Sequence, residues 1–433
     1  MNLSNPLRDA QIQGTSLSRS ASAVTVKTKP RRIGFFGIFG VRNLGNECTL
    51  EAILHNARRY APAAELYAIS YEPEDTARRH GIRAFPARPL GGTSFGKKRT
   101  VINRLLRVLT QKIPAEVFSW FTAIRILKGT EMLIMTGTGM LTDYSNSCFG
   151  WPYHILKWAV CARIVGCRVR FISSGVGPIH ERLSRRFIKI ALGLADYRSF
   201  RDKQSKMKLQ GLGMELSSDP VVPDLAFSLP TDMVHAASPR PKVRTVGLGV
   251  MRHVNLHLGS ATGTRDAYRS YLRKMCDLME WLIRHGYGVR MLQGDAKYDE
   301  SVRRDIRLAF ESRGMNYEKV GILDEDSASP AEVLEQISRT DFVISPRFHN
   351  LVFAFILGRP AISISYDPKN DALLESMDLG KYRQSITDLS TEVLIGQFEE
   401  LSARTAEVSP ALLNKAAEFR NILEKQYELI FNA

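Results

Sequence analysis

Residues 344–360 hold an arginine and a histidine where both could act on one anion. Arg347 and His349 are separated by one residue, between an apolar run at residues 341–345 and an apolar stretch with helical spacing. This pattern predicts a strand-to-helix junction, where the helix N-terminus and a fixed cation favour a bound anion. An imidazole beside that anion could act as an acid. The competing interpretation is a histidine whose ring is satisfied within the core.

Two more predicted strand ends carry side chains that suit the same ligand. Arg201 follows an apolar run, and Ser205 comes shortly after it, where a helix is expected to begin. A planar guanidinium matches a carboxylate or phosphate better than an ammonium does. Lys369 follows the apolar run at residues 361–366 and adds a cation to the same rim. The alternative for Arg201 is a surface ion pair with its neighbour Asp202.

Two glycine-containing loops also follow predicted strands. The first, residues 37–47, contains Asn43 and Asn46, and its backbone amides could cradle an anion. Glycines are also needed simply to turn tightly between a strand and a helix. The second loop, residues 135–143, ends in Asp143, which could orient a sugar hydroxyl or accept its proton. The alternative for Asp143 is the cap of a helix or turn.

These loops belong to a repeating alternation of strand-like and helix-like segments. Apolar runs are separated by amphipathic stretches, and a second such series begins at residue 244. The runs of the first series are residues 33–38, 66–70, 132–136, 169–174 and 197–200. Such alternation indicates parallel sheets covered by helices, with ligands at the carboxyl ends of the strands. We predict an α/β fold with two doubly wound Rossmann-like domains that face each other across a cleft.

The composition along the chain divides it into five predicted segments. Residues 1–30 are rich in Ser, Thr and basic residues without apolar periodicity, which predicts a disordered basic arm. Residues 31–230 are expected to form the N-terminal Rossmann-like domain, and the proline-containing residues 231–243 a linker. Residues 244–390 are expected to form the C-terminal Rossmann-like domain with the Arg-x-His segment. Residues 391–433 are expected to form closing helices.

Composition also narrows the function classes. The chain has 433 residues, 44% of them hydrophobic, which is enough for two domain cores. Its formal charge of +16 predicts attraction to anions, but no nucleic-acid-binding motif accompanies the basic residues, so we predict no nucleic-acid partner. Five cysteines without paired spacing favour a reducing compartment and no metal site. Without a signal-like or membrane-spanning apolar run, the chain is expected to be cytoplasmic.

Residues 96–129 are strongly basic and amphipathic. They contain eight Lys and Arg residues against one Glu, and apolar and basic positions fall on opposite helical faces. Such helices lie on anionic lipid, and Phe118, Trp120 and Phe121 could extend the contact. The alternative is an ordinary helix that packs its apolar face on the core. The first interpretation predicts peripheral binding to the inner face of the membrane.

Taken in order, the motifs resemble those of the polysaccharide pyruvyl transferase family. They are a Gly-Asn loop at 45–46, a glycine turn at 137–139 before Asp143, Gly-Val-Gly-Pro at 175–178, Arg-Asp-x-x-Ser at 201–205, Arg-x-His at 347–349 and Tyr-Asp-x-Lys at 366–369. The set covers roughly residues 33–380. The chain departs from the family pattern at Asn46, where aspartate is usual, and at Thr138, where a glycine is usual.

The resemblance implies a glycosyltransferase B fold and transfer of the enolpyruvyl group of phosphoenolpyruvate to a sugar of a polysaccharide or its lipid-linked precursor. The product would be a pyruvate ketal, and phosphate would be released. Phosphoenolpyruvate would be the co-substrate, and no other cofactor is expected. His349 is the implied catalytic residue. The candidates for donor binding are Arg201, Arg347, Ser205 and Lys369, and those for acceptor binding are Asn43, Asn46, Asp143, His154 and His180.

Two other functions fit the same sequence. A nucleotide-sugar-dependent glycosyltransferase could use the same fold, because fold alone does not decide function. A non-catalytic, membrane-associated scaffold would keep the fold without turnover. Thermal stabilisation by phosphoenolpyruvate or by a nucleoside diphosphate separates the first alternative from a pyruvyl transferase.

Overall fold

The protein contains two parallel six-stranded sheets. The computed structural model describes residues 31–41, 43–88, 113–144, 147–235, 243–252, 261–295 and 299–432. The strand order is β3-β2-β1-β4-β5-β6 in the first sheet and β12-β11-β10-β7-β8-β9 in the second. In each sheet the direction of winding reverses beside the first strand of the series, which makes both sheets doubly wound. The predicted fold class is confirmed.

The strands of the first sheet are β1 (Arg32–Phe36), β2 (Glu65–Ser70), β3 (Arg83–Pro86), β4 (Met132–Met135), β5 (Arg168–Ser174) and β6 (Tyr197–Phe200). Those of the second are β7 (Thr245–Gly249), β8 (Gly288–Leu292), β9 (Ile322–Leu323), β10 (Phe342–Ser345), β11 (Ala361–Ser365) and β12 (Arg383–Ser385). The predictions did not include β3, β9 and β12. These edge strands are short, and none contains the buried apolar run that marks a central strand.

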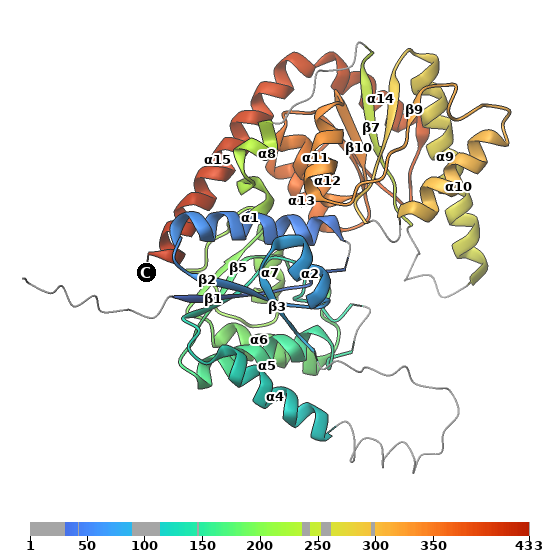
Figure 1. The fold of residues 1–433 in the computed structure, drawn as a ribbon. Helices are drawn as coiled ribbons and strands as arrows, with labels where there is room; N and C mark the ends of the chain where they lie inside the picture. The colour runs from blue at the N-terminus through green and yellow to red at the C-terminus, as the bar shows by residue number, and fades with distance from the viewer. Residues whose placement is uncertain are drawn as a thin grey trace, which may run out of the picture. The chain divides into compact units, whose positions relative to one another are not determined.

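Helices cover both faces of each sheet. We call residues 31–235 the first half and residues 243–432 the second half. The helices of the first half are α1 (Leu44–Tyr60), α2 (Pro73–His80), α4 (Ile113–Leu127), α5 (Trp151–Ile164), α6 (Arg182–Gly193) and α7 (Lys203–Gly211), followed by the 3-10 helix η2 (Leu225–Ser228) and α8 (Thr231–His235). In the second half they are α9 (Ala261–Arg284), α10 (Asp299–Glu311), α11 (Pro330–Ser338), α12 (Phe348–Ile356), α13 (Pro368–Ser376), α14 (Thr391–Ala403) and α15 (Thr405–Phe431). Helix α1 lies on one face of the first sheet, and α5 and α6 lie on the other (Figure 1).

Neighbouring residues of β1 belong to different cores, as the alternation of a strand requires. Ile33 and Phe35 pack in one apolar cluster with residues of α1, while Phe36 packs in another with residues of α5. The first cluster continues into the second sheet through residues such as Leu248 of β7. The two sheets are therefore joined through a shared apolar core.

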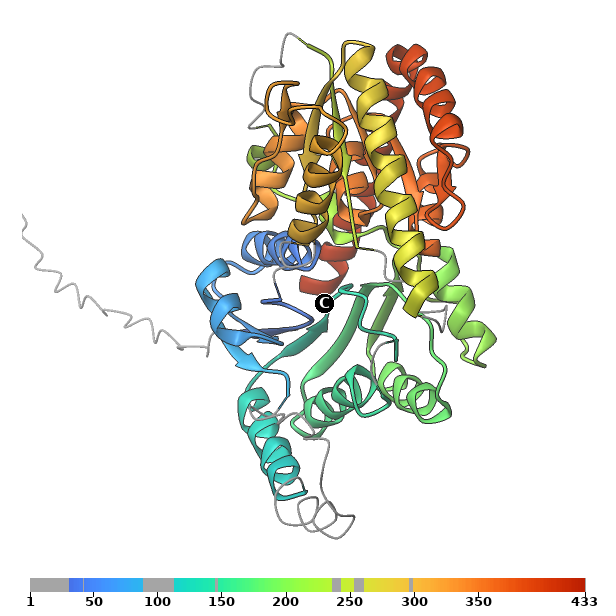
Figure 2. The ribbon, with the colours of Figure 1, turned by 90° about the vertical axis from the view of Figure 1, so that its right-hand side faces the viewer.

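The last helix, α15, returns from the second half to the first sheet (Figure 2). Arg170 of β5 donates a hydrogen bond of 2.6 Å from Nη1 to the carbonyl oxygen of Ile430. The hydroxyls of Ser228 and Tyr427 are 2.7 Å apart. These contacts tie the end of the chain to the half in which it begins.

Three predicted segments fall partly or wholly outside the described residues. These are the basic arm at residues 1–30, the section 96–112 of the basic amphipathic segment, and positions 236–242 of the linker. The predicted linker begins with α8, a short helix. Within the described ranges, no helix is long and apolar enough to cross a membrane.

Candidate functional site

A cavity of about 350 Å³ lies where loops from the two halves meet. Its lining includes residues that follow β4, β5 and β6 in the first half and β10 and β11 in the second, at the carboxyl ends of parallel strands. The sequence-predicted site residues in the lining are Asn43, Asn46, Arg201, Ser205, Arg347, His349 and Lys369. Residues separated by more than 300 positions in the sequence therefore meet in one site.

Arg347 reaches the cavity from the second half as the N-cap residue of α12. Its guanidinium forms an ion pair with Asp299, which is fully buried, and the Nε atom lies 3.1 Å from Oδ2 of that carboxylate. The same carboxylate accepts hydrogen bonds from the backbone amides of Gly294 and Asp295, at 2.9 and 2.8 Å. Asp299 therefore fixes the direction of the guanidinium at the cavity wall.

Arg201 reaches the cavity from the first half, just after β6. Its Nη1 atom lies 3.4 Å from Oδ2 of Asp224, and its Nε atom lies 3.5 Å from Oδ2 of Asp202. The guanidinium also lies over the ring of Phe348, 4.6 Å from its centroid. The sequence left open a surface ion pair between Arg201 and Asp202. The two side chains do form an ion pair, but the Arg201 side chain is only 11% exposed, so the pair does not lie on the surface.

His349 lies in the first turn of α12 with its ring between the two halves. Among the described residues its Nε2 atom has no hydrogen-bond partner; the nearest carboxylate oxygen, Oδ1 of Asp224, is 3.8 Å away. Burial lowers the pKa of His349 to about 4, Asp224 opposes this shift, and Arg201 and Lys369 add to it. The ring is therefore neutral near pH 7.

Two glycines give these side chains the space that they occupy. A Cβ atom on Gly45, in the first turn of α1, would lie 2.0 Å from Nδ1 of His349. A Cβ atom on Gly175 would lie 2.6 Å from Nη2 of Arg201. Both distances are far shorter than van der Waals contact, so any larger residue would displace the imidazole or the guanidinium. Gly45 and Gly175 thus act by allowing close approach.

Ser205 and Lys369 complete the predicted donor-binding set. The Ser205 hydroxyl accepts a hydrogen bond of 3.0 Å from the backbone amide of Val176, which connects α7 to the loop after β5. Lys369 lies at the start of α13, with its Nζ atom 3.7 Å from Oδ2 of Asp367. Asp367 also accepts a hydrogen bond from the Lys369 amide and so caps that helix. Arg201, Arg347 and Lys369 together make the cavity wall cationic.

The loop between β1 and α1 carries Asn43 and Asn46 and contacts the second half. Asn43 caps α1 by accepting a hydrogen bond of 3.3 Å from the amide of Asn46. Its Nδ2 atom donates to Oδ2 of Asp295, at 3.4 Å, and the amide of Leu44 donates to the carbonyl oxygen of Gly294, at 3.2 Å. The position of this loop is therefore coupled to the second half.

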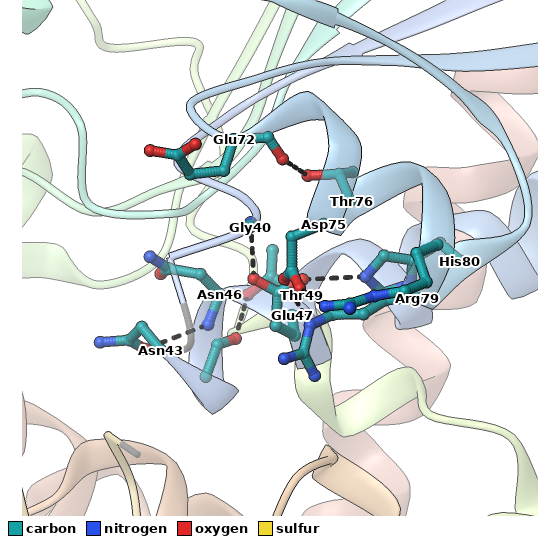
Figure 3. Close-up of polar contacts among 12 residues, drawn as sticks. Gly40, Asn43, Asn46, Glu47, Thr49, Glu72, Asp75, Thr76, Arg79 and His80 are labelled. Carbon is teal, nitrogen blue, oxygen red and sulfur yellow. Dashed lines mark hydrogen bonds and ion pairs between the residues drawn. The ribbon is translucent and has the colours of Figure 1, made fainter. Parts of the chain in front are cut away.

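Glu47, which the sequence predictions did not include, contacts Gly40 of the same loop and His80 of α2 (Figure 3). Its buried carboxylate accepts a hydrogen bond of 2.8 Å from the amide of Gly40, and its other oxygen lies 2.9 Å from Nε2 of His80. An acidic residue in the first turn of a helix is ordinarily assigned to the helix dipole. Only the three-dimensional contact reveals that Glu47 fixes the glycine loop.

Asp224 was also missed, although it lies beside both Arg201 and His349. It is 4% exposed, and its Oδ1 atom also accepts a hydrogen bond of 3.0 Å from the amide of Ala226. The one signal in the sequence is a lone carboxylate within an apolar stretch at residues 221–229. Burial of such a group is costly without partners, so it indicates a charged partner without identifying it.

Three predicted acceptor residues are absent from the part of the cavity lining that the structure describes. Asp143 accepts hydrogen bonds from the backbone amides of His180 and Glu181, at 2.9 and 2.8 Å, so its carboxylate holds the loop before α6. His154 lies within α5, where burial lowers its pKa to about 4. We assign none of Asp143, His154 and His180 to the cavity.

Comparison with known protein families shows the family to which the chain belongs. The family model for polysaccharide pyruvyl transferase matches residues 43–368, which is most of the sequence and includes every cavity residue named above except Lys369. The chain belongs to the polysaccharide pyruvyl transferase family. Members of this family are transferases that move a pyruvyl group to a polysaccharide, and the chain is a transferase of this general kind. No curated protein matches the sequence.

Solved structures support the fold of this pyruvyl transferase. The UDP-GlcNAc 2-epimerase of Neisseria meningitidis has a TM-score of 0.51 at 11% identity, and the match covers 91% of this chain and 100% of the epimerase. A glycosyltransferase from Rickettsia africae has a TM-score of 0.55 at 11% identity, covering 93% and 98%. A lipopolysaccharide outer core galactosyltransferase has a TM-score of 0.52 at 12% identity, covering 93% and 99%. The pyruvyl transferase therefore has a glycosyltransferase B fold.

Proposed function

We propose that this pyruvyl transferase moves the enolpyruvyl group of phosphoenolpyruvate onto a sugar of a polysaccharide or its lipid-linked precursor, and forms a pyruvate ketal. The observation that carries the proposal is the pairing of cations with a histidine in one cavity. Arg201, Arg347 and Lys369 line it together with His349. Phosphoenolpyruvate has a carboxylate and a phosphate, and two guanidinium groups, one from each half, suit two anionic groups.

The reaction begins with protonation of the methylene carbon of phosphoenolpyruvate, which makes the neighbouring carbon electrophilic. A sugar hydroxyl attacks that carbon and loses its proton. The carbon–oxygen bond to phosphate breaks, and a second hydroxyl of the same sugar attacks the same carbon to close the ring. The new methyl group holds the proton from the acid, one of the two hydroxyl protons restores the acid, and the other leaves with phosphate. The polysaccharide gains one carboxylate.

His349 is the proposed acid. Its pKa of about 4 leaves it neutral near pH 7. Burial is the main cause of this low pKa, and Arg201 and Lys369 add to it; a bound carboxylate and phosphate would place negative charge beside the ring and so raise the pKa of His349 in the donor complex. A proton donor held in position in this way accounts for about two to four orders of magnitude in rate. The arginines stabilise the charge on the departing phosphate.

The first test is binding of the donor to the purified chain. Phosphoenolpyruvate should raise the melting temperature, because a ligand present at about one hundred times its dissociation constant stabilises a protein by about 2.7 kcal/mol. UDP and UDP-GlcNAc serve as comparison ligands, because they would stabilise a nucleotide-sugar glycosyltransferase. Stabilisation by the nucleotides but not by phosphoenolpyruvate would contradict the proposal.

The second test is turnover. Phosphoenolpyruvate is incubated with the chain and a panel of soluble and lipid-linked sugar acceptors, and phosphate release is measured together with the mass of the glycan. We expect phosphate and a ketal-bearing glycan in equal amounts. Donor binding without phosphate release from any acceptor would favour the non-catalytic scaffold.

A further inference from the structure

Helix α4 turns several large apolar side chains toward solvent. Phe118 is 71% exposed and Phe121 67%, and they lie one turn apart on the same side of the helix. Val117 and Ile113 are also about half exposed. The opposite side of α4 is the one that packs on the protein, through residues such as Leu127. A globular protein normally keeps such a set of side chains away from water.

The apolar surface continues across the neighbouring helices. Phe149, just before α5, is 64% exposed, and its ring lies 6.4 Å from that of Phe187 in α6. Ile190 and Leu183 of α6 are exposed as well. Helices α4, α5 and α6 cover the same face of the first sheet (Figures 1 and 2). The exposed apolar side chains therefore lie on α4, on α6 and just before α5.

The charged residues on this face are mostly basic. Arg125 and Lys128 are exposed at the end of α4, and Arg182 and Arg186 are exposed on α6. The one acidic residue of α4, Glu116, is turned inward: its Oε1 atom lies 3.0 Å from Nζ of Lys157, a fully buried side chain, and accepts a hydrogen bond from the hydroxyl of Tyr153.

The indole nitrogen of Trp120 also donates to the Tyr153 hydroxyl, at 2.8 Å. Together with the Lys157–Glu116 pair, this bond fixes the rotation of α4 about its axis. The exposed phenylalanines are thus held outward by polar contacts on the inner side of the helix. The orientation of α4 is built into the fold, and an apolar face with a basic rim is its result.

We propose that this face, formed by the exposed sides of α4 and α6 and by Phe149, docks on an anionic lipid bilayer. Aromatic and aliphatic side chains would enter the headgroup region while arginine and lysine contact lipid phosphates. The charge favours a bilayer over a second copy of the chain, because a basic face repels itself in a symmetric dimer. In sequence, residues 97–112 directly before α4 add six Lys and Arg and no Asp or Glu. The proposal does not depend on the proposed function.

The test is co-flotation of the full chain with vesicles of phosphatidylcholine containing phosphatidylglycerol, and with vesicles of phosphatidylcholine alone. The chain should float with the anionic vesicles, and less so at high salt. Replacing Phe118 and Phe121 together by serine should lower the partition coefficient about tenfold or more, because two large apolar side chains no longer enter the lipid. Arg125→Glu with Lys128→Glu should reduce binding to the anionic vesicles in particular.

Matched control variants test whether binding depends on this face, or only on the number of exposed apolar side chains and on the net charge. Leu308→Ser with Val393→Ser removes two similarly exposed apolar side chains from the second half, and Arg304→Glu with Lys425→Glu makes the same change in charge elsewhere. Both controls should float like the unchanged chain, and melting temperatures verify folding of all variants. Flotation of the α4 variants at the level of the controls would overturn the proposal. A concentration-dependent dimer that the phenylalanine variants dissociate would assign the face to a second copy instead.

Discussion

Replacing Gly45 by alanine tests the position of the His349 ring through a residue that carries no functional group. The added Cβ would lie 2.0 Å from Nδ1 and 2.4 Å from Cε1 of the imidazole. Ordinary contact begins near 3.4 Å, so the ring would have to retreat by about 1.4 Å. A displacement of about 1 Å in a reacting group costs about a hundredfold in rate, so we expect a loss of that order in kcat.

Helix propensity makes this variant easy to interpret. Gly45 lies in the first turn of α1, where alanine is favoured over glycine by about 1 kcal/mol or less. A large fall in kcat with little change in melting temperature would therefore locate the effect at the ring. Gly193→Ala is the matched control, because Gly193 is also helical and a Cβ there meets no atom within 4 Å. Phosphate release by Gly45→Ala at the rate of the control would refute the argument.

Four further variants test the remaining parts of the site. His349→Gln should still bind phosphoenolpyruvate but lose about two to four orders of magnitude in turnover; near-normal turnover would make the residue structural. Arg201→Lys and Arg347→Lys should each weaken phosphoenolpyruvate binding in calorimetry, because lysine lacks the planar fork; unchanged affinity would remove that residue from the donor site. Asp224→Asn should shift the falling limb of the pH–rate profile to lower pH, because Asp224 raises the pKa of His349. An equal loss of rate at every pH would limit Asp224 to a structural role.

The central strands could be predicted from the sequence because burial on both faces leaves a continuous apolar run. Residues 342–345 read Phe-Val-Ile-Ser and are all buried in β10. The edge strands lack that signal: β3 is partly exposed along its length, and β12 reads Arg-Gln-Ser. Their pairing is set by the neighbouring strand, with Ser363 of β11 opposite Arg383, and not by their own residues.

The rule that ligands gather at the carboxyl ends of parallel strands brought Arg201, Arg347, His349 and Lys369 together correctly in one cavity. The same rule could not exclude Asp143, because a polar residue after a strand serves a backbone loop as readily as a ligand. Asp224 was missed for the opposite reason. Its partners, Arg201 and His349, come from different halves of the chain, and no local pattern joins them.

The low pKa of His349 fits the proposed chemistry of the cavity. Burial lowers the pKa of His349, Arg201 and Lys369 add to this shift and Asp224 opposes it, so the protonated ring is disfavoured and an anionic donor would favour it. Phosphoenolpyruvate would bring that charge and would be held by arginines from both halves, while Asn43 fixes the loop beside the ring and Gly45 leaves space for the ring. Donor binding, contact between the halves and protonation of His349 would then be linked. The acid would be charged only when the methylene carbon that it protonates is in place.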